Sequence, residues 1–85
     1  MKIGIIHEIH DPEAFAELGT TLLEKQPTGI RNLQACMSEE LDTCTCIWDA
    51  PSVEELSEFV DASLGEASTQ EYFPILESQS IGLPE

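Results

Sequence analysis

Basic residues are scarce in this sequence. Its 85 residues include 17 Asp and Glu but only 3 Lys and Arg, which gives a formal net charge of −14. Because like charges repel, a surface this acidic disfavours the backbone of nucleic acids and the surface of an anionic membrane as partners. Anionic substrates are disfavoured for the same reason, so a small-molecule ligand is expected to be uncharged or cationic.

Long apolar runs are absent as well, and none approaches the ~20 residues of a membrane-spanning helix. The first residues turn polar at His7 without a small-residue cleavage site, so no signal peptide is expected. Cysteines number only 3, and they cannot all pair within one chain. Cys44 and Cys46 are close neighbours on an expected strand, which is poor geometry for a disulfide. We therefore expect reduced thiols and a cytoplasmic location.

The chain is too short for more than one domain. A domain of this size buries only ~60–65% of the surface of its unfolded chain, and association is a common remedy for marginal stability. We expect a single domain over residues 1–85 that forms a homodimer or a higher homo-oligomer. Residues 78–85 are predicted to form a C-terminal arm, in which Ile81 and Leu83 are unusually apolar for an acidic terminus. The arm is expected to dock on the partner chain, with packing on its own chain as the alternative.

The clearest local pattern covers residues 43–64, where a strand runs directly into a helix. Apolar and polar side chains alternate along the strand, and Pro51 then ends it because proline lacks a backbone N–H. Ser52, with Glu55 three residues later, has the spacing of a helix N-terminal capping box. Trp48 is predicted to anchor the core, with its indole N–H bonded to a carbonyl at the rim.

The remaining elements follow from the same two periodicities. Strands are predicted over residues 2–9, 30–37, 43–50 and 71–77, and helices over residues 12–25 and 53–64. Asp11 is placed to cap the first helix. Gly19 interrupts that helix, and it either allows a close approach to the sheet or is a tolerated defect. Pro74 places the last strand at a sheet edge. The order βαββαβ predicts the ferredoxin-like fold of the α+β class, an antiparallel sheet of four strands with both helices on one face.

The second and third strands are expected to form a hairpin, since only about six residues separate them. The register that brings apolar residues together pairs Met37 with Cys44, Ala35 with Cys46 and Leu33 with Trp48. It leaves Cys36 opposite Thr45 on the other face. We therefore interpret Cys44 and Cys46 as small core residues beneath the helices, and Cys36 as the accessible thiol.

Three segments carry a family resemblance that extends over nearly the whole chain. They are Ile6-His7-Glu8-Ile9-His10-Asp11-Pro12-Glu13, Pro27-Thr28-Gly29-Ile30 and Cys46-Ile47-Trp48-Asp49-Ala50-Pro51-Ser52-Val53-Glu54. With them the chain resembles small bacterial members of the dimeric α+β barrel superfamily, which includes cofactor-free monooxygenases and muconolactone-isomerase-like enzymes. The resemblance implies subunits that pair sheet to sheet and enclose a cavity in each half of the dimer. No catalytic motif of these enzymes matches, so the resemblance assigns no catalytic residue and no cofactor.

The expected function is the binding of a small organic ligand in the cavity between the sheets, with a cofactor-free monooxygenase or isomerase included in that expectation. The candidate ligand-binding residues are His7 and the polar groups on the face that a partner sheet would cover, namely Asn32, Gln34, Cys36 and Thr45. His7 is also the candidate general base, since imidazole titrates near neutral pH. Two alternatives stay open. One is a non-catalytic homo-oligomeric interaction module, and the other is a transition-metal site at which His7, His10 and Cys36 converge.

Overall fold

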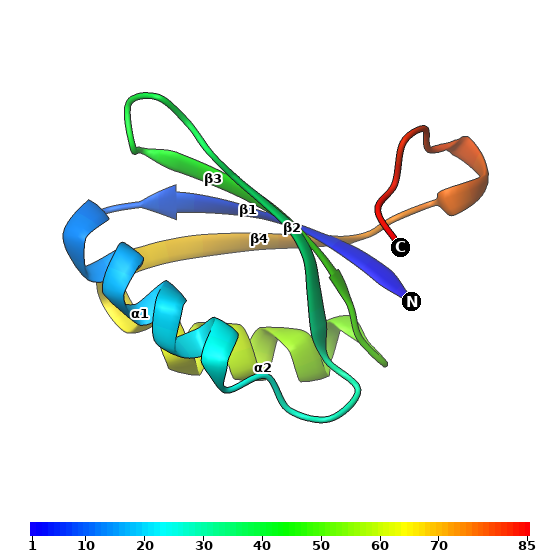
Figure 1. Cartoon of the computed structure of the whole chain (residues 1–85), viewed down its shortest axis with the longest axis horizontal. Helices are drawn as coiled ribbons and strands as arrows, with labels where there is room; N and C mark the ends of the chain where they lie inside the picture. Colours follow the sequence, from blue (N-terminus) through cyan, green and yellow to red (C-terminus); the bar gives the residue numbers. More distant parts are fainter.

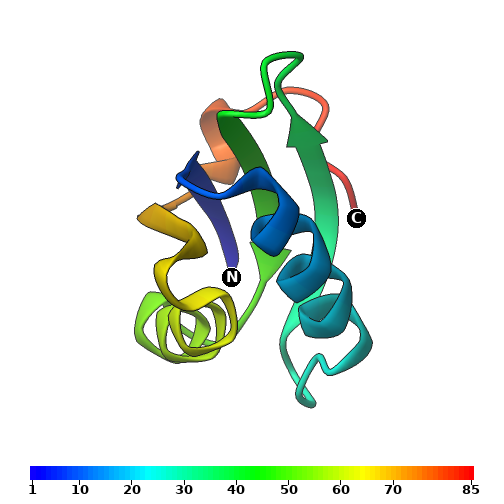
Figure 2. The same cartoon turned by 90° about the vertical axis from the view of Figure 1, so that its left-hand side faces the viewer.

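The computed structural model describes all 85 residues, in the order of elements that the sequence predicts. The elements are β1 (Lys2–Ile9), α1 (Pro12–Glu24), β2 (Arg31–Met37), β3 (Thr43–Asp49), α2 (Val53–Leu64) and β4 (Ser68–Pro74), with short 3-10 helices at Gly65–Ala67 and Glu77–Gln79. The 4 strands form one sheet in the order β2-β3-β1-β4, and every neighbouring pair is antiparallel. Both helices lie on the same side of the sheet (Figure 1 and Figure 2). This is the ferredoxin-like α+β fold, as predicted.

Both helices begin at the predicted caps. Oδ1 of Asp11 accepts a hydrogen bond from the backbone N–H of Ala14 at 3.1 Å, and this bond caps α1. Oγ of Ser52 accepts one from the N–H of Glu55 at 3.1 Å and caps α2. Each bond satisfies a backbone donor that the first helical turn leaves without a partner. Gly65 follows α2 with a φ of 55°, a conformation that glycine adopts at little cost.

The core lies between the helices and the face of the sheet that carries the odd-numbered residues of β1. Ile3 and Ile5 are fully buried there, in one cluster with Leu56, Val60 and Leu64 of α2. Burial of such an aliphatic side chain contributes roughly 1.5–3 kcal/mol. This layer is therefore the main source of the fold's stability.

The opposite face of the sheet has no helix on it, as predicted. Ile6 and Phe73 are exposed on this face, and Ile47 is half-buried. The Phe73 ring lies over Gly4, and a Cβ added to Gly4 would come within 2.2 Å of a ring carbon. A glycine at this position therefore lets an aromatic ring rest against the sheet.

The last strand, β4, lies three residues earlier than predicted, because it begins at Ser68 and ends at Pro74. Its first residues are polar, but long-range partners override that local signal. Ser68 pairs with Ile9 at the end of β1, and its hydroxyl donates to Oε1 of Gln70. Pro74 pairs with Ile3, close to the start of β1, and β4 has no strand on its other side. The prediction of an edge strand is confirmed.

The β2–β3 hairpin has the predicted register except at its open end. The pairs Met37 with Cys44, Ala35 with Cys46 and Cys36 with Thr45 are confirmed. The predicted pair of Leu33 with Trp48 is wrong, because a bulge at Leu33 brings Asn32 opposite Trp48. The backbone N–H of Asn32 donates to Oε1 of Gln26 at 2.7 Å, so a side chain takes up this donor next to the irregular step. The bulge places Asn32 on the helix side of the sheet.

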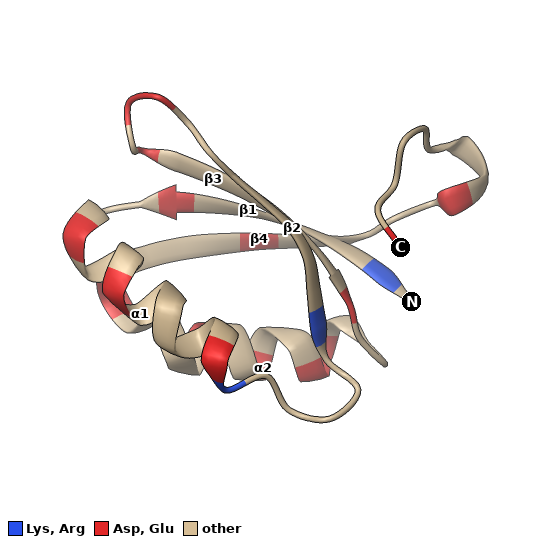
Figure 3. Ribbon diagram, in the orientation of Figure 1, with Lys and Arg blue, Asp and Glu red and all other residues tan.

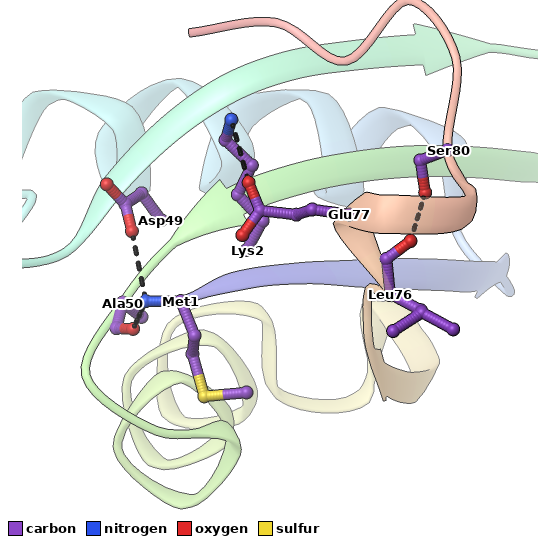
Figure 4. A network of polar contacts seen from close by, with 7 residues as sticks. All are labelled: Met1, Lys2, Asp49, Ala50, Leu76, Glu77 and Ser80. Carbon is purple, nitrogen blue, oxygen red and sulfur yellow. Dashed lines mark hydrogen bonds and ion pairs between the residues drawn. The ribbon is translucent and has the colours of Figure 1, made fainter.

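The segment that follows β4 and leads into the C-terminal arm lies against its own chain (Figure 4). The N–H of Ile75 donates to the carbonyl oxygen of Lys2 at 2.9 Å, and Nζ of Lys2 forms an ion pair with Glu77 at 3.3 Å. Because the Lys2 side chain belongs to the helix-free face, the arm turns onto that side of the sheet. Leu83 is half-buried, whereas Ile81 is 100% exposed. Docking of the arm on a partner chain stays a prediction.

Acidic side chains are spread over both helices, the sheet and the loops (Figure 3). The basic residues Lys2, Lys25 and Arg31 lie at the start of β1, just after α1 and at the start of β2. Neither helix has the length and apolarity that crossing a membrane requires.

Candidate functional site

A cavity of about 240 Å³ lies between α1 and the β2–β3 hairpin, on the helix-covered face of the sheet. It exists because α1 leaves β2 largely uncovered, so that Ala35 and Met37 are exposed although they face the helix side. Most of the lining is apolar, since 12 of its 16 residues are hydrophobic. The cavity therefore suits a small and mainly apolar molecule.

Gly19 keeps this cavity open. It lies between Phe15 and Leu22 on the buried stripe of α1, where any side chain would project toward the sheet. A Cβ placed on Gly19 would meet no atom within 4 Å. A close approach of helix and sheet is therefore not the reason for this glycine. Its missing side chain leaves space unfilled.

His7 forms part of the cavity wall and is held by a chain of hydrogen bonds. The residue is only 3% exposed, and its ring meets the ring of Phe15 edge-on at a centroid distance of 5.3 Å. Nδ1 of His7 lies 3.2 Å from Oε1 of Gln70, whose Nε2 donates to Oδ1 of Asp61 at 2.9 Å. The hydroxyl of Tyr72 donates to the same Asp61 oxygen at 2.7 Å. This chain connects the cavity wall to the protein surface.

These contacts determine which nitrogen of His7 carries the proton. A carboxylate only accepts hydrogen bonds, so the Gln70 amide must present its nitrogen to Asp61 and its oxygen to His7. That oxygen also only accepts, so Nδ1 of His7 is the protonated nitrogen. Burial lowers the pKa of His7, and Gln70 and Asp61 raise it only in part, which keeps the ring neutral at neutral pH. Nε2 then has a lone pair and no protein partner, and it can accept a hydrogen bond from a ligand.

Two thiols lie side by side on the part of the wall formed by β3. Sγ of Cys44 and Sγ of Cys46 are 3.9 Å apart, and both residues are buried free cysteines, as predicted. The hydrogen bond with the Cys46 thiol lowers the pKa of Cys44 to about 7, against the effect of burial and with help from the backbone of Cys36. The same contact, together with burial, raises the pKa of Cys46. Cys44 is therefore the thiol that ionises first.

Trp48 lines the cavity from β3, and its indole N–H is buried without a hydrogen-bond partner. The predicted bond from this N–H to a carbonyl is wrong. The indole packs edge-on against Phe59 at a centroid distance of 6.2 Å. The indole N–H lies near enough to Cys46 to oppose the rise in the pKa of that thiol, but it makes no hydrogen bond of normal geometry. An unpaired buried donor costs roughly 1–3 kcal/mol.

The five predicted ligand-binding residues are divided between the two faces of the sheet. His7 and Asn32 lie on the helix side, and both line the cavity. Cys36 contributes to the lining as well, although its register places it beside Thr45. Gln34 and Thr45 lie on the helix-free face and are not part of the cavity. The bulge in β2 explains why Asn32 but not Gln34 lies on the helix side, whereas His7 lies there because the odd-numbered residues of β1 face the helices.

The three residues of the alternative metal site do not converge. His7 is buried on the helix side and bonded to Gln70. His10 follows β1, and its Nε2 lies 2.7 Å from Oγ1 of Thr69. Cys36 belongs to β2, which β3 separates from β1. No group of three or more His, Cys, Asp or Glu side chains is arranged to hold a metal ion, so this alternative lacks the convergence it requires.

Sequence reasoning missed the residues that shape the cavity on the helix side. They include Gly19, Met37, Cys44, Cys46 and Trp48. The cysteines and the tryptophan have the alternation of core residues, and burial alone does not distinguish a core residue from a cavity wall. The available signal was Gly19, because a glycine on the buried stripe of a helix marks either a close contact or a void.

Acid is expected to destabilise the fold through His7. The pKa of His7 is lowered in the folded protein, so the unfolded chain, with its ordinary value of 6.5, binds the proton more tightly. As the pH falls below ~6.5, the free energy of unfolding should decrease by up to ~1.4 kcal/mol per pH unit until the folded ring protonates. Urea denaturation at a series of pH values below ~6.5 should show this dependence of the free energy of unfolding on pH. The variant His7→Gln should lose the part of the dependence that His7 contributes. An NMR titration with the folded ring at or above its ordinary pKa would contradict the expectation.

Comparison with known proteins leaves the chain without a match among family models, curated proteins or solved structures. The functional argument therefore depends on the fold and the cavity. Because one fold hosts many functions, the cavity is the better guide of the two.

Proposed function

We propose that this domain binds a small organic molecule in the cavity between α1 and the β2–β3 hairpin. The supporting observation is an apolar wall that carries a polar group without a partner, the Nε2 acceptor of His7. Binding sites for small molecules commonly combine apolar surface with a few polar groups that fix the orientation of the ligand. The ligand should therefore have an apolar body and a hydrogen-bonding group.

Volume and charge restrict this ligand further. A dry apolar cavity of ~150 Å³ is enough for benzene, so the present cavity of about 240 Å³ has room for a ring with a short substituent. No Lys or Arg lines the cavity, and the chain carries a net charge of −14. An anionic group would have no partner there, so the ligand is uncharged or cationic.

Three matched probes test the proposal, namely benzyl alcohol, benzylamine and benzoate. They share a benzene ring and differ in the charge of the substituent. Trp48 is the single tryptophan and lies in the wall, so its fluorescence reports occupancy directly. Benzyl alcohol and benzylamine should give saturable changes, and benzoate should bind at least about tenfold more weakly, equal to about 1.4 kcal/mol.

A control variant distinguishes the two faces of the sheet. Thr45→Val changes the helix-free face, so binding of benzyl alcohol should be unchanged. A loss of affinity in Thr45→Val would move the site to the space between two sheets. Equal affinity for benzoate, or the lack of a saturable signal with every probe, would overturn the proposal.

His7 extends the proposal to cofactor-free catalysis of the isomerase type. A neutral imidazole with a free Nε2 lone pair can take a proton from a bound substrate and return it to another atom of that substrate. In the variant His7→Gln, turnover of such a substrate should be lost, whereas benzyl alcohol should still bind. Retained turnover in that variant would show that His7 is not the catalytic base.

A homodimer joined through the helix-free face is a second part of the proposal. Ile6 and Phe73 are exposed on that face, and the apolar side chain of Ile81 beside it is fully exposed. Covering such a face is a usual reason for association in small domains. Light scattering at micromolar concentration should give a dimer, and Phe73→Glu should shift it toward monomer. A stable, folded wild-type monomer would contradict this part.

A cytoplasmic location completes the proposal. All 3 cysteines are free, and Cys36 is exposed. Exposed thiols persist in a reducing compartment, whereas an oxidising one favours disulfides. Fractionation of cells of the source organism should find the protein in the cytoplasmic fraction, and recovery in a secreted fraction would contradict it.

A further inference from the structure

Three sulfur atoms come from neighbouring positions of the cavity wall. The thiols of Cys44 and Cys46 are 3.9 Å apart, and Met37 stands directly opposite Cys44 in the β2–β3 ladder. Side chains of directly opposed residues begin only ~4.5–5.5 Å apart, so the Met37 thioether can reach the thiol of Cys44. All three residues line the cavity, and Met37 is exposed where the cavity opens along β2. We refer to Met37, Cys44 and Cys46 as the sulfur cluster.

We propose that the sulfur cluster binds one Cu(I) ion through the thiolates of Cys44 and Cys46, with the thioether of Met37 as a third ligand. Two metal–sulfur bonds of ~2.3 Å can join sulfur atoms up to ~4.6 Å apart. The observed separation of 3.9 Å therefore allows one ion to bridge the two thiols without backbone movement. Thiolate and thioether ligands favour soft metal centres, namely Cu(I), zinc and iron–sulfur clusters, and Cu(I) is the one of these that a site of three sulfur ligands suits.

The cavity offers little to other cations. Structural zinc sites take four ligands from Cys, His or carboxylate side chains, and no group of even three such side chains is arranged for a metal here. Calcium and magnesium require oxygen ligands, but no carboxylate lines the cavity. A soft ion that accepts a few sulfur ligands is the one that fits.

Binding exchanges protons for the ion and moves no electrons. The S–H bonds of Cys44 and Cys46 break, both protons leave to solvent, and two Cu–S bonds form while copper stays monovalent. Two neutral thiols and one cation thus become a complex with a single negative charge. The net charge of −14 favours the approach of the cation, and the exposed Met37 gives it a first sulfur contact.

The copper proposal is independent of the organic ligand, because the sulfur cluster is defined by its own geometry. Binding of benzyl alcohol and binding of Cu(I) are measured in separate experiments. If benzyl alcohol fails to bind and Cu(I) binds, only the function proposed above is lost. If the reverse holds, only the copper site is lost.

The test titrates the reduced chain with Cu(I) under anaerobic conditions, in competition with the colorimetric chelator bicinchoninate. The wild type should retain one equivalent of Cu(I). Cys44→Ala and Cys46→Ala should each weaken binding at least about 100-fold, and Met37→Leu about tenfold or less. His10→Ala is the control, because His10 is a possible metal ligand that lies outside the cavity with its Nε2 against Thr69, and it should keep the wild-type affinity.

X-ray absorption of the wild-type copper complex gives a readout that does not require a core variant to fold. It should show sulfur ligands only. Nitrogen or oxygen ligands, loss of the bound equivalent in His10→Ala, or wild-type affinity in Cys44→Ala would each overturn the assignment. The absence of copper binding by the folded wild type would do so as well.

Discussion

Leu56→Ala is expected to bring the protein to the edge of unfolding. Leu56 is 0% exposed and belongs to the core cluster of 14 buried residues. Removing its side chain should cost roughly 2–5 kcal/mol, from the lost transfer free energy and the cavity left behind. Domains have a stability of only ~5–15 kcal/mol, and a short chain lies at the low end. Urea denaturation followed by circular dichroism should therefore show the midpoint falling by about half or more.

Leu23→Ala provides the matched control in the other helix. Leu23 is 44% exposed, so the same change of side chain removes much less buried surface. Its cost should stay below ~1 kcal/mol. Equal losses in the two variants, or a loss below ~1 kcal/mol in Leu56→Ala, would mean that the layer between α2 and the sheet does not hold the fold together.

Gly19→Leu is expected to remove ligand binding while it stabilises the protein. Leucine is a far better helix former than glycine, by roughly 0.5–1 kcal/mol. The space beyond the Cβ position is free, so the new side chain enters the cavity without a clash at Cβ. Affinity for benzyl alcohol should fall at least about thirtyfold, equal to about 2 kcal/mol. Trp48 fluorescence and urea denaturation measure the two opposite effects on one variant.

Gly19→Ala separates these two effects. A single methyl group brings most of the gain in helix propensity but fills little of a cavity of about 240 Å³. Stability should therefore rise about as much as in Gly19→Leu, and affinity for benzyl alcohol should remain near the wild-type value. If Gly19→Leu binds benzyl alcohol as the wild type does, the ligand does not occupy the space beneath α1.

The fold was predictable because most of its signals involve residues close together in the chain. The caps at Asp11 and Ser52 each depend on a bond that spans a single helical turn. The alternation along β3 and the position of Pro74 are also local patterns. For these reasons the predicted helix bounds agree with the observed ones to within a residue.

Features that depend on distant partners were not predictable in the same way. β4 starts at Ser68 because Ile9 offers it a strand to pair with, although local composition suggests a connection. The bulge at Leu33 lies beside a contact between the backbone of Asn32 and a side chain of the preceding loop. The pairing with Ile9 and the contact with the preceding loop cannot be identified from the periodicity of a single segment.

The position of the cavity could not be predicted from the sequence for a related reason. An amphipathic stripe indicates which face of a helix is buried, but it does not indicate how far across the sheet the helix lies. Because α1 leaves β2 uncovered, a cavity lies beneath this helix, whereas a cavity between two sheets stays a prediction. Three of the five predicted ligand residues, His7, Asn32 and Cys36, nevertheless belong to its lining.

The uncovered strand β2 also determines how the molecule should open. β1 is paired on both sides and buried under the helices, whereas β2 is paired only with β3 and is exposed over most of its length. In native-state hydrogen exchange the amides of β2 should therefore lose protection well before those of β1. Strand β2 can then separate from β3 while the core between β1 and the helices stays intact. A molecule bound in the cavity should slow exchange most in β2, because this strand supplies part of the lining.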